Sequence, residues 1–165
     1  MWEKYKMGEQ IHIYTDGACR GNPGPGGYGI VMEWVGKPYK KEYAEGYLKT
    51  TNNRMELLAV IIALENLKSD NLEITVFSDS KYVTDAINLD WIAKWKRRRF
   101  ANVKNPNLWR RFIKLYDKHQ PKMVWIKGHN NHPQNERCDR LAVTASHKKD
   151  KQIDEGFESN KDSLF

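Results

Sequence analysis

Four carboxylic acids stand where metal-dependent chemistry could use them: Asp16, Glu56, Asp79 and Asp139. Asp16 and Asp79 each end a run of residues predicted to form a strand. If those strands are parallel neighbours, both carboxylates emerge at one edge of the sheet, where ligands bind in α/β folds. Carboxylates held together there repel each other unless one is protonated or a cation lies between them. Oxygen ligands suit Mg²⁺ or Mn²⁺ rather than zinc. The pattern therefore predicts a divalent-metal site.

Three of these acids also have a simpler explanation. Asp16 precedes a loop rich in Gly and Pro, and Asp commonly begins turns. Glu56 has capping-box spacing with Asn53, and an acid there would suit the helix dipole. Asp139 follows Cys138 on a predicted helix, where a solvated surface acid is the ordinary interpretation. Residue type and spacing leave both explanations open.

His129 follows the last predicted strand, in the polar loop 128–133. A histidine at that edge of the sheet could hold or transfer a proton near neutral pH. A solvated loop histidine is an equally good interpretation. The glycines after Asp16 do not match a P-loop or a dinucleotide fingerprint.

The segment 91–100 interleaves aromatic residues with cations, and the whole chain carries a formal net charge of +7. Cations neutralise phosphates and aromatic rings stack on bases or sugars, so this composition favours a nucleic-acid partner. The alternative is a helix whose tryptophans are core and whose cations are solvated. We expect both to hold in part, with Trp95 in the core. The candidate contacts are Trp91, Lys94, Lys96, Arg97 and Arg98.

Hydrophobic periodicity predicts the elements that must position these residues. Strands are expected over 11–17, 28–35, 39–48, 72–77 and 123–126, and helices over 54–67, 80–89, 90–99, 106–118 and 134–147. Short turns between the first three strands suggest an antiparallel meander, whereas the strand–helix–strand order that follows implies a crossover to a parallel neighbour. We expect one α/β domain with a mixed sheet flanked by helices.

Composition narrows the setting of the protein. Its 165 residues are enough for one domain with a real core, and two cysteines do not make a disulfide framework or a zinc site. Cysteine usage suits a reducing cytosol. The N-terminus has no apolar core of a signal peptide, and no apolar run is long enough to span a bilayer. We therefore expect a cytoplasmic protein that does not contact membranes.

Four segments, in order, resemble the motifs of bacterial type 1 ribonuclease H: 15–29, 50–57, 78–83 and 127–139. The resemblance covers about Gln10 to Ser146. It implies a ribonuclease H-like sheet of five strands, three antiparallel and then two parallel. It also implies an N-terminal extension over 1–10, a catalytic domain over 11–147 and a partly disordered C-terminal tail over 148–165.

The resemblance implies an endonuclease that cuts the RNA strand of RNA–DNA hybrids and leaves 5′-phosphate and 3′-hydroxyl ends. The cofactor would be two Mg²⁺ ions, with Mn²⁺ as a possible substitute, in a two-metal mechanism of known type. The four metal-binding positions of the family match Asp16, Glu56, Asp79 and Asp139. The histidine that aids proton transfer or product release matches His129.

Further positions match residues of the family that contact the hybrid. The minor groove would be lined by Cys19, Asn22, Asn52, Asn53 and Glu56. Thr51 and Asn105 would hold a phosphate of the DNA strand, although the loop before Asn105 is shorter than in familiar members. Trp91 would line the DNA-strand channel, in a basic stretch that matches the family's handle. Asn131 stands where Gly is common, and Asn tolerates left-handed backbone.

Three rival functions compete with this interpretation. A non-catalytic hybrid-binding module is disfavoured by the four intact acids. An integrase- or resolvase-type nuclease shares the metal chemistry, but the Thr51–Asn53 group and the basic stretch favour a hybrid substrate. The nuclease domain of a reverse transcriptase is disfavoured because the sequence contains no polymerase segment.

The last four residues, 162–165, are a separate hypothesis. They end in an apolar pair beside an acid, and resemble short tails that bind sliding clamps or related replication proteins. The competing interpretation is a disordered end. No motif points to an oligomer, so we expect a monomer.

Overall fold

The protein is built on a mixed five-stranded sheet, seen here in a computed structural model that describes residues 8–157. The strand order is β3-β2-β1-β4-β5. β1, β2 and β3 pair antiparallel, whereas β4 runs parallel to β1 and β5 parallel to β4. The predicted sheet is confirmed. Its strands are β1 (Glu9–Cys19), β2 (Gly24–Trp34), β3 (Lys40–Thr50), β4 (Leu72–Ser78) and β5 (Lys122–Trp125).

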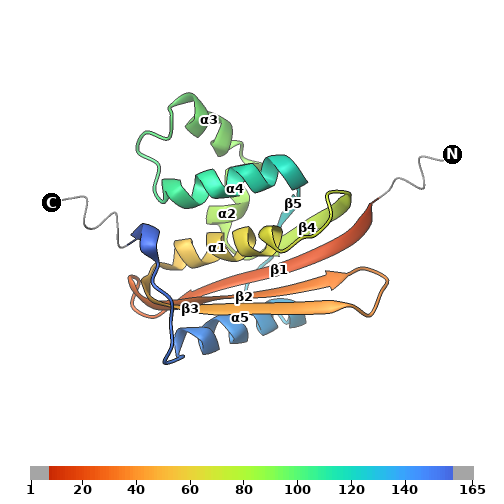
Figure 1. Ribbon diagram of the computed structural model, residues 1–165, viewed down its shortest axis with the longest axis horizontal. Helices are drawn as coiled ribbons and strands as arrows, with labels where there is room; N and C mark the ends of the chain where they lie inside the picture. The colour runs from red at the N-terminus through yellow and green to blue at the C-terminus, as the bar shows by residue number, and fades with distance from the viewer. Residues whose placement is uncertain (1–7, 158–165) are drawn as a thin grey trace.

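The five helices assigned within residues 8–157 lie on the two sides of the sheet (Figure 1). One helix, α5, packs on β1, β2 and β3 from one side, while α1 packs on β1 and β2 from the other. The outer face of α1 is covered by α4, and α3 lies beyond α4, at the end of the molecule away from the sheet (Figure 1). The bounds are α1 (Asn52–Glu65), α2 (Lys81–Asn88), α3 (Trp91–Arg97), α4 (Pro106–His119) and α5 (Pro133–Ser146).

Helix α1 is the centre of the core. Its residues 57–61 are all buried, because the helix lies between the sheet and α4. Its apolar side chains surround the helix axis, as expected of a helix that is buried on more than one face. On the α4 side, Trp109 is fully buried and meets Phe112 and Trp95 edge to face.

The segment predicted as one long Gly/Pro loop is mostly strand. β1 continues to Cys19 and β2 begins at Gly24, so the connection is only residues 20–23. Asp16 therefore lies within β1 and not at its last polar position. The prediction of an open loop over 17–27 was wrong because glycine density has a second cause, close packing between layers.

The glycines of β1 and β2 allow helices to approach the sheet. A Cβ on Gly29 would overlap the carbonyl oxygen of Cys138 in α5, and one on Gly27 would lie 2.6 Å from the Ala142 carbonyl oxygen. On the other face, a Cβ on Gly17 would lie 2.5 Å from the Glu56 nitrogen. Side chains at these three positions would push α5 and α1 away from the sheet.

The packed unit extends beyond residue 147. Gln152 forms a parallel bridge with Tyr47 of β3, where its N–H donates to Gly46 at 2.7 Å and its carbonyl accepts from Leu48 at 2.9 Å. Asp154 is buried. Residues 148–157, assigned from the sequence to a partly disordered tail, are thus in part docked on the sheet. The rest of that tail, with the 162–165 motif, lies outside the described residues, as do residues 1–7.

Helix length and hydropathy bear on the membrane question. Within residues 8–157, none of the helices is both long enough and apolar enough to cross a bilayer.

The close approach of α5 to β2 predicts a stability difference between two glycine variants. Gly29→Ala should lower the free energy of unfolding by about 3 kcal/mol, because the new methyl meets backbone that cannot rotate away. Gly36→Ala, whose Cβ would meet nothing within 4 Å but whose φ is +80°, should cost only about 1 kcal/mol. Urea unfolding measures both. An equal loss in the two variants would contradict the packing role of Gly29.

Candidate active site

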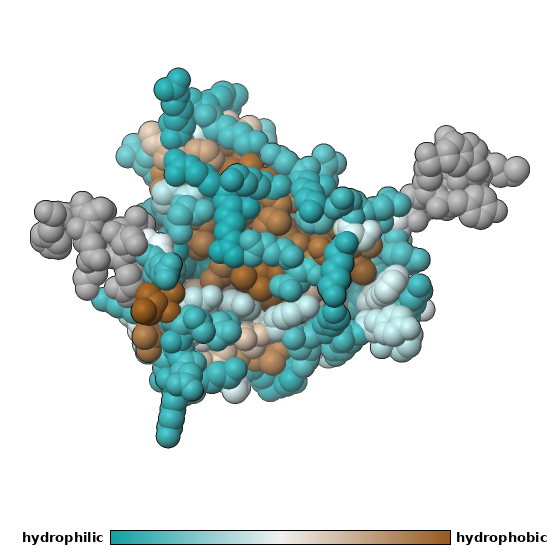
Figure 2. Space-filling view, viewed as in Figure 1, coloured by the Kyte–Doolittle hydropathy of each residue, from teal (hydrophilic) through white to brown (hydrophobic). Residues whose placement is uncertain are grey.

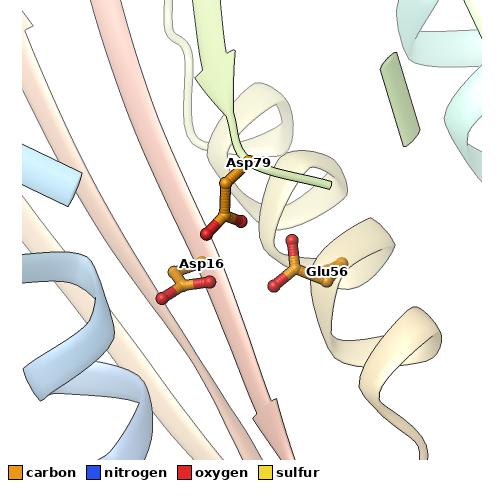
Figure 3. Close-up of side chains that lie close together, drawn as sticks. All are labelled: Asp16, Glu56 and Asp79. Carbon is orange, nitrogen blue, oxygen red and sulfur yellow. The ribbon is translucent and has the colours of Figure 1, made fainter. Parts of the chain in front are cut away.

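Three carboxylates from three different elements converge at one point (Figure 3). Asp16 comes from β1, Glu56 from the first turns of α1, and Asp79 from the residue after β4. One oxygen of each lies within 4.8 Å of the others. The parallel register pairs Thr15 of β1 with Ser78, the last residue of β4, and each aspartate is the next residue along its chain segment. The fold therefore places together three acids that are far apart in the chain.

Asp139 and His129 line the same open cavity as these acids. The cavity has a volume of about 290 Å³, and Gly17, Asn52 and Ser80 complete its lining. Asp139 lies in the second turn of α5, and His129 in the loop that precedes that helix. Every residue predicted to take part directly in catalysis thus borders one cavity.

Glu56 is directed into the site by the way α1 begins. The N-cap is Thr51, whose hydroxyl accepts the Arg54 N–H at 3.2 Å, so the helix starts at Asn52. The capping box between Asn53 and Glu56 is therefore wrong. The Glu56 carboxylate instead accepts the backbone N–H of Gly17 in β1. With only 3% of Glu56 exposed, this hydrogen bond ties the acid to the sheet.

Burial and mutual repulsion make these acids reluctant to ionise. Loss of solvent raises the pKa of Glu56, and the charges of Asp16 and Asp79 raise it further. Burial also raises the pKa of Asp16 to about 7, and the charges of Asp79 and Asp139 add to the rise, although the Gly17 N–H donated to its carboxylate opposes it. For Asp79, burial again raises the pKa, while the nearby His129 lowers it.

The donor set fits a divalent cation. Oxygen Oε2 of Glu56 is buried and has no hydrogen-bond partner among the described residues. An unpaired buried carboxylate oxygen is costly, and so is the repulsion among three acids. A hard cation with oxygen ligands would satisfy that oxygen and offset the repulsion. The residues present therefore fit such an ion.

The residues predicted to line the minor groove lie beside the carboxylates. Asn22, in the connection between β1 and β2, accepts the backbone N–H of Asn52 at 2.8 Å. Asn52 and Asn53 are exposed in the first turn of α1, and Cys19 is half-buried next to the Thr50 carbonyl. One hydrogen bond thus joins the connection between β1 and β2 to the first turn of α1.

Thr51 and Asn105 are linked by Arg54. The Asn105 side chain accepts from Nη1 of Arg54 at 3.2 Å and donates to the Tyr82 hydroxyl at 3.0 Å. Arg54 in turn belongs to the same helical turn that Thr51 caps. Asn105 adopts a left-handed conformation, with φ of 57°, just before α4.

The basic stretch 91–100, predicted to match the handle of the family, forms α3 and the three residues after it. Trp95 packs against Trp109 with ring centroids 4.9 Å apart, and Trp91 lies 6.4 Å from Trp95. Both tryptophans are partly buried, as the mixed interpretation of this segment expects. The cations stay outside, and Figure 2 shows mainly hydrophilic residues at this end of the molecule, with some apolar ones between them. The exposed cations are Lys94, Lys96, Arg97 and Arg98.

Comparison with known proteins decides the family. Residues 8–147 match the family model described as RNase H. The chain belongs to the RNase H family. A ribonuclease H of Desulforamulus reducens is 50% identical over 143 residues, which are 84% of this chain and 88% of the relative.

Two solved members of the RNase H family share the fold. LC9-RNase H1, described as a type 1 RNase H with the type 2 active-site motif, has a TM-score of 0.77 at 27% identity, covering 92% of this chain and 80% of its own. LC11-RNase H1, solved in complex with an RNA/DNA hybrid, has a TM-score of 0.60 at 32% identity, covering 82% and 95%.

Sequence reasoning missed two residues that support this RNase H site. Trp125 at the end of β5 donates its indole N–H to the Asp79 carbonyl at 3.0 Å, and Lys81 lies over its ring. The signal was an aromatic residue at a strand end, four residues before His129. Arg54, in the first turn of α1, was also missed. Its side chain is buried, and no neighbouring residue in the sequence indicates which partner offsets its charge.

Two residues of the histidine loop adopt a left-handed backbone conformation. His129 and Asn131 both have φ of 54°, in the left-handed region. Asn131 stands where glycine is common in the family, and asparagine is among the non-glycine residues that best tolerate left-handed backbone.

The raised carboxyl pKa values predict the stability of the metal-free protein. The folded state binds more protons than the unfolded state between pH 4 and about 7, so stability should fall as pH rises through that window. In EDTA at pH 7.5, Asp16→Asn should raise the free energy of unfolding by on the order of 2 kcal/mol, because it removes one repelling charge.

At pH 3.5 the difference should become small, because Asp16 is then protonated in the folded state and mostly protonated in the unfolded state, where its pKa has the ordinary value of 3.8. Thermal unfolding at the two pH values measures this, with the exposed Asp150→Asn as control. A less stable Asp16→Asn protein at pH 7.5 would contradict the electrostatic description of the site.

Proposed function

We propose that the protein is an endonuclease that hydrolyses the RNA strand of RNA–DNA hybrids with two divalent metal ions, leaving 5′-phosphate and 3′-hydroxyl ends. One observation carries the proposal: three carboxylates converge around an unpaired buried oxygen of Glu56, in a chain of the RNase H family. The hybrid bound to the relative LC11-RNase H1 supports the substrate class.

The ions would be held by Asp16, Glu56, Asp79 and Asp139, with Mg²⁺ as the cofactor and Mn²⁺ as a possible substitute. When bound, two such ions supply an activated water and stabilise the leaving oxygen of an in-line displacement at phosphorus. Gly17 holds one Glu56 oxygen by its N–H, so the other stays directed into the site. Trp125 holds the backbone of Asp79 in the same way.

His129 is assigned a role in proton transfer or product release. It is exposed at the border of the catalytic cavity, in a loop that begins after β5. An imidazole there can take up or deliver a proton near neutral pH. Its position in a loop allows it to move toward or away from the reacting phosphate.

Substrate recognition would use the residues around the N-terminal end of α1 and the handle. The 2′-hydroxyl groups of the RNA strand distinguish a hybrid from DNA. The polar surface of Cys19, Asn22, Asn52, Asn53 and Glu56 would read the minor groove. Thr51 and Asn105 would hold a DNA-strand phosphate, and the handle would follow the DNA strand with Trp91, Lys94, Lys96, Arg97 and Arg98.

We also propose that the protein acts as a monomer in the cytoplasm. Both cysteines, Cys19 and Cys138, are free thiols, which suits a reducing compartment. Contact of residues 162–165 with a replication protein stays a hypothesis about residues that the structure does not describe.

A matched panel of duplexes tests the reaction. Labelled RNA–DNA should be cleaved in its RNA strand with Mg²⁺ and not with EDTA, whereas RNA–RNA and DNA–DNA of the same sequence should stay intact. Asp16→Asn should lower the cleavage rate by at least about 10³-fold, the equivalent of about 4 kcal/mol of transition-state stabilisation, with hybrid binding largely retained. Cleavage of DNA–DNA would favour an integrase-type nuclease, and near-normal activity of Asp16→Asn would overturn the metal assignment.

If the cations of the handle contact phosphates, removing them should weaken the salt dependence of hybrid binding. Replacing Arg97 and Arg98 by Ala should raise KM for the hybrid and reduce the slope of log affinity against log salt by about one for each lost phosphate contact. The value of kcat should not change, because neither residue borders the catalytic cavity. Lys41→Ala, an exposed cation on β3, is the control. An unchanged slope in the double variant would remove the handle from the DNA contact.

A further inference from the structure

A buried ion pair joins the segment after α5 to the first turn of α1. Asp154 accepts from Nε of Arg54 at 2.7 Å and from Nη2 at 2.8 Å, so the pair is bidentate. The side chains are 8% and 1% exposed, respectively. The Thr50 hydroxyl donates to the same carboxylate at 2.7 Å. Two parallel hydrogen bonds to one carboxylate fix the plane of the guanidinium group as well as its position.

The remaining nitrogen of Arg54 faces the start of α4. Because Asp154 fixes the guanidinium plane, the direction of Nη1 is determined too. Nη1 donates to the side-chain oxygens of Asn105 and Asn107, both at 3.2 Å. The Asn105 amide is therefore held on its oxygen side by Arg54, and on its nitrogen side by Tyr82. An amide nitrogen has two N–H groups, which leaves a second donor for a ligand.

Asp154 reaches this position because its segment is anchored on both sides. Figure 1 shows the chain after α5 crossing the edge of β3 toward the N-terminal end of α1. Gln152 pairs with β3 just before Asp154. Two residues after it, a Cβ on Gly156 would overlap Asn107 and lie 2.9 Å from Nη2 of Arg54. A side chain there would have to displace Asn107, so the segment packs closely over the ion pair.

We propose that Asp154 is a positioning residue for the contact with the DNA-strand phosphate. It fixes Arg54, and Arg54 orients the Asn105 amide next to the helical turn capped by Thr51. The proposal rests on the proposed function, which assigns Thr51 and Asn105 to that phosphate. It places a residue beyond 147, outside the segment that matches the family model, among those that act on substrate binding.

The first test replaces the charge of Asp154 and keeps its shape. Asp154→Asn, assayed below its unfolding temperature, should raise KM for the hybrid roughly fivefold, the change that corresponds to one lost hydrogen bond, with kcat unchanged. Asp150→Asn, an exposed acid in the same segment, should change neither constant. A purely structural role would lower the unfolding temperature and leave KM as it was, and that result would overturn the proposal.

A double-mutant cycle shows whether Asp154 acts through Asn105. Asn105→Ala alone should raise KM. Adding Asp154→Asn to it should produce no further rise in KM, yet should still lower the unfolding temperature, because Arg54 then lacks its partner. The same fold-change in KM in both backgrounds would overturn the proposal.

Arg54→Lys provides a second variant if Asp154→Asn does not fold. Lysine keeps the buried charge pair but lacks the fork that reaches Asn105, so KM should rise while the fold is kept. An unchanged KM would overturn the proposal. Failure of the proposed function is a different result: the unmodified protein would not cleave the RNA–DNA hybrid at all.

Discussion

Repulsion among Asp16, Glu56 and Asp79 is the constraint on which the rest of this structure depends. Their oxygens lie within 4.8 Å of one another, two of the three residues are buried, and burial raises every one of their pKa values. Such a cluster destabilises the folded protein unless protons or a cation offset the charge. The arrangement persists because each acid is attached to an element that packing holds in place.

Helix α1 supplies most of that packing. It is buried between the sheet and α4, and it approaches β1 so closely that only glycine fits at position 17. The same contact lets the Gly17 N–H hold Glu56. At the N-terminal end of α1, the Arg54–Asp154 pair joins the helix to the segment after α5 and to Asn105. One helix thus connects the acidic centre with the residues proposed to hold the DNA strand.

Much of the fold could be predicted because its signals are local. Alternating residues indicated the strands, and the apolar run from 57 to 64 indicated a buried helix. The errors arose where a local pattern has two physical causes. Glycines 17 and 27 were taken for a loop, although they make room for helices. The spacing of Asn53 and Glu56 suggested a cap, but the helix begins one residue after Thr51.

By itself, the sequence determined the order of the elements, the mixed character of the sheet and the resemblance to ribonuclease H. Only the tertiary structure decided that Asp16 of β1 lies beside Asp79 at the end of β4, that Glu56 joins these two acids and does not form a capping box, and that residues after 147 are part of the packed unit. The physical reason is distance along the chain. Asp154 lies 100 residues from Arg54, and a contact of that separation leaves no periodic trace in either segment.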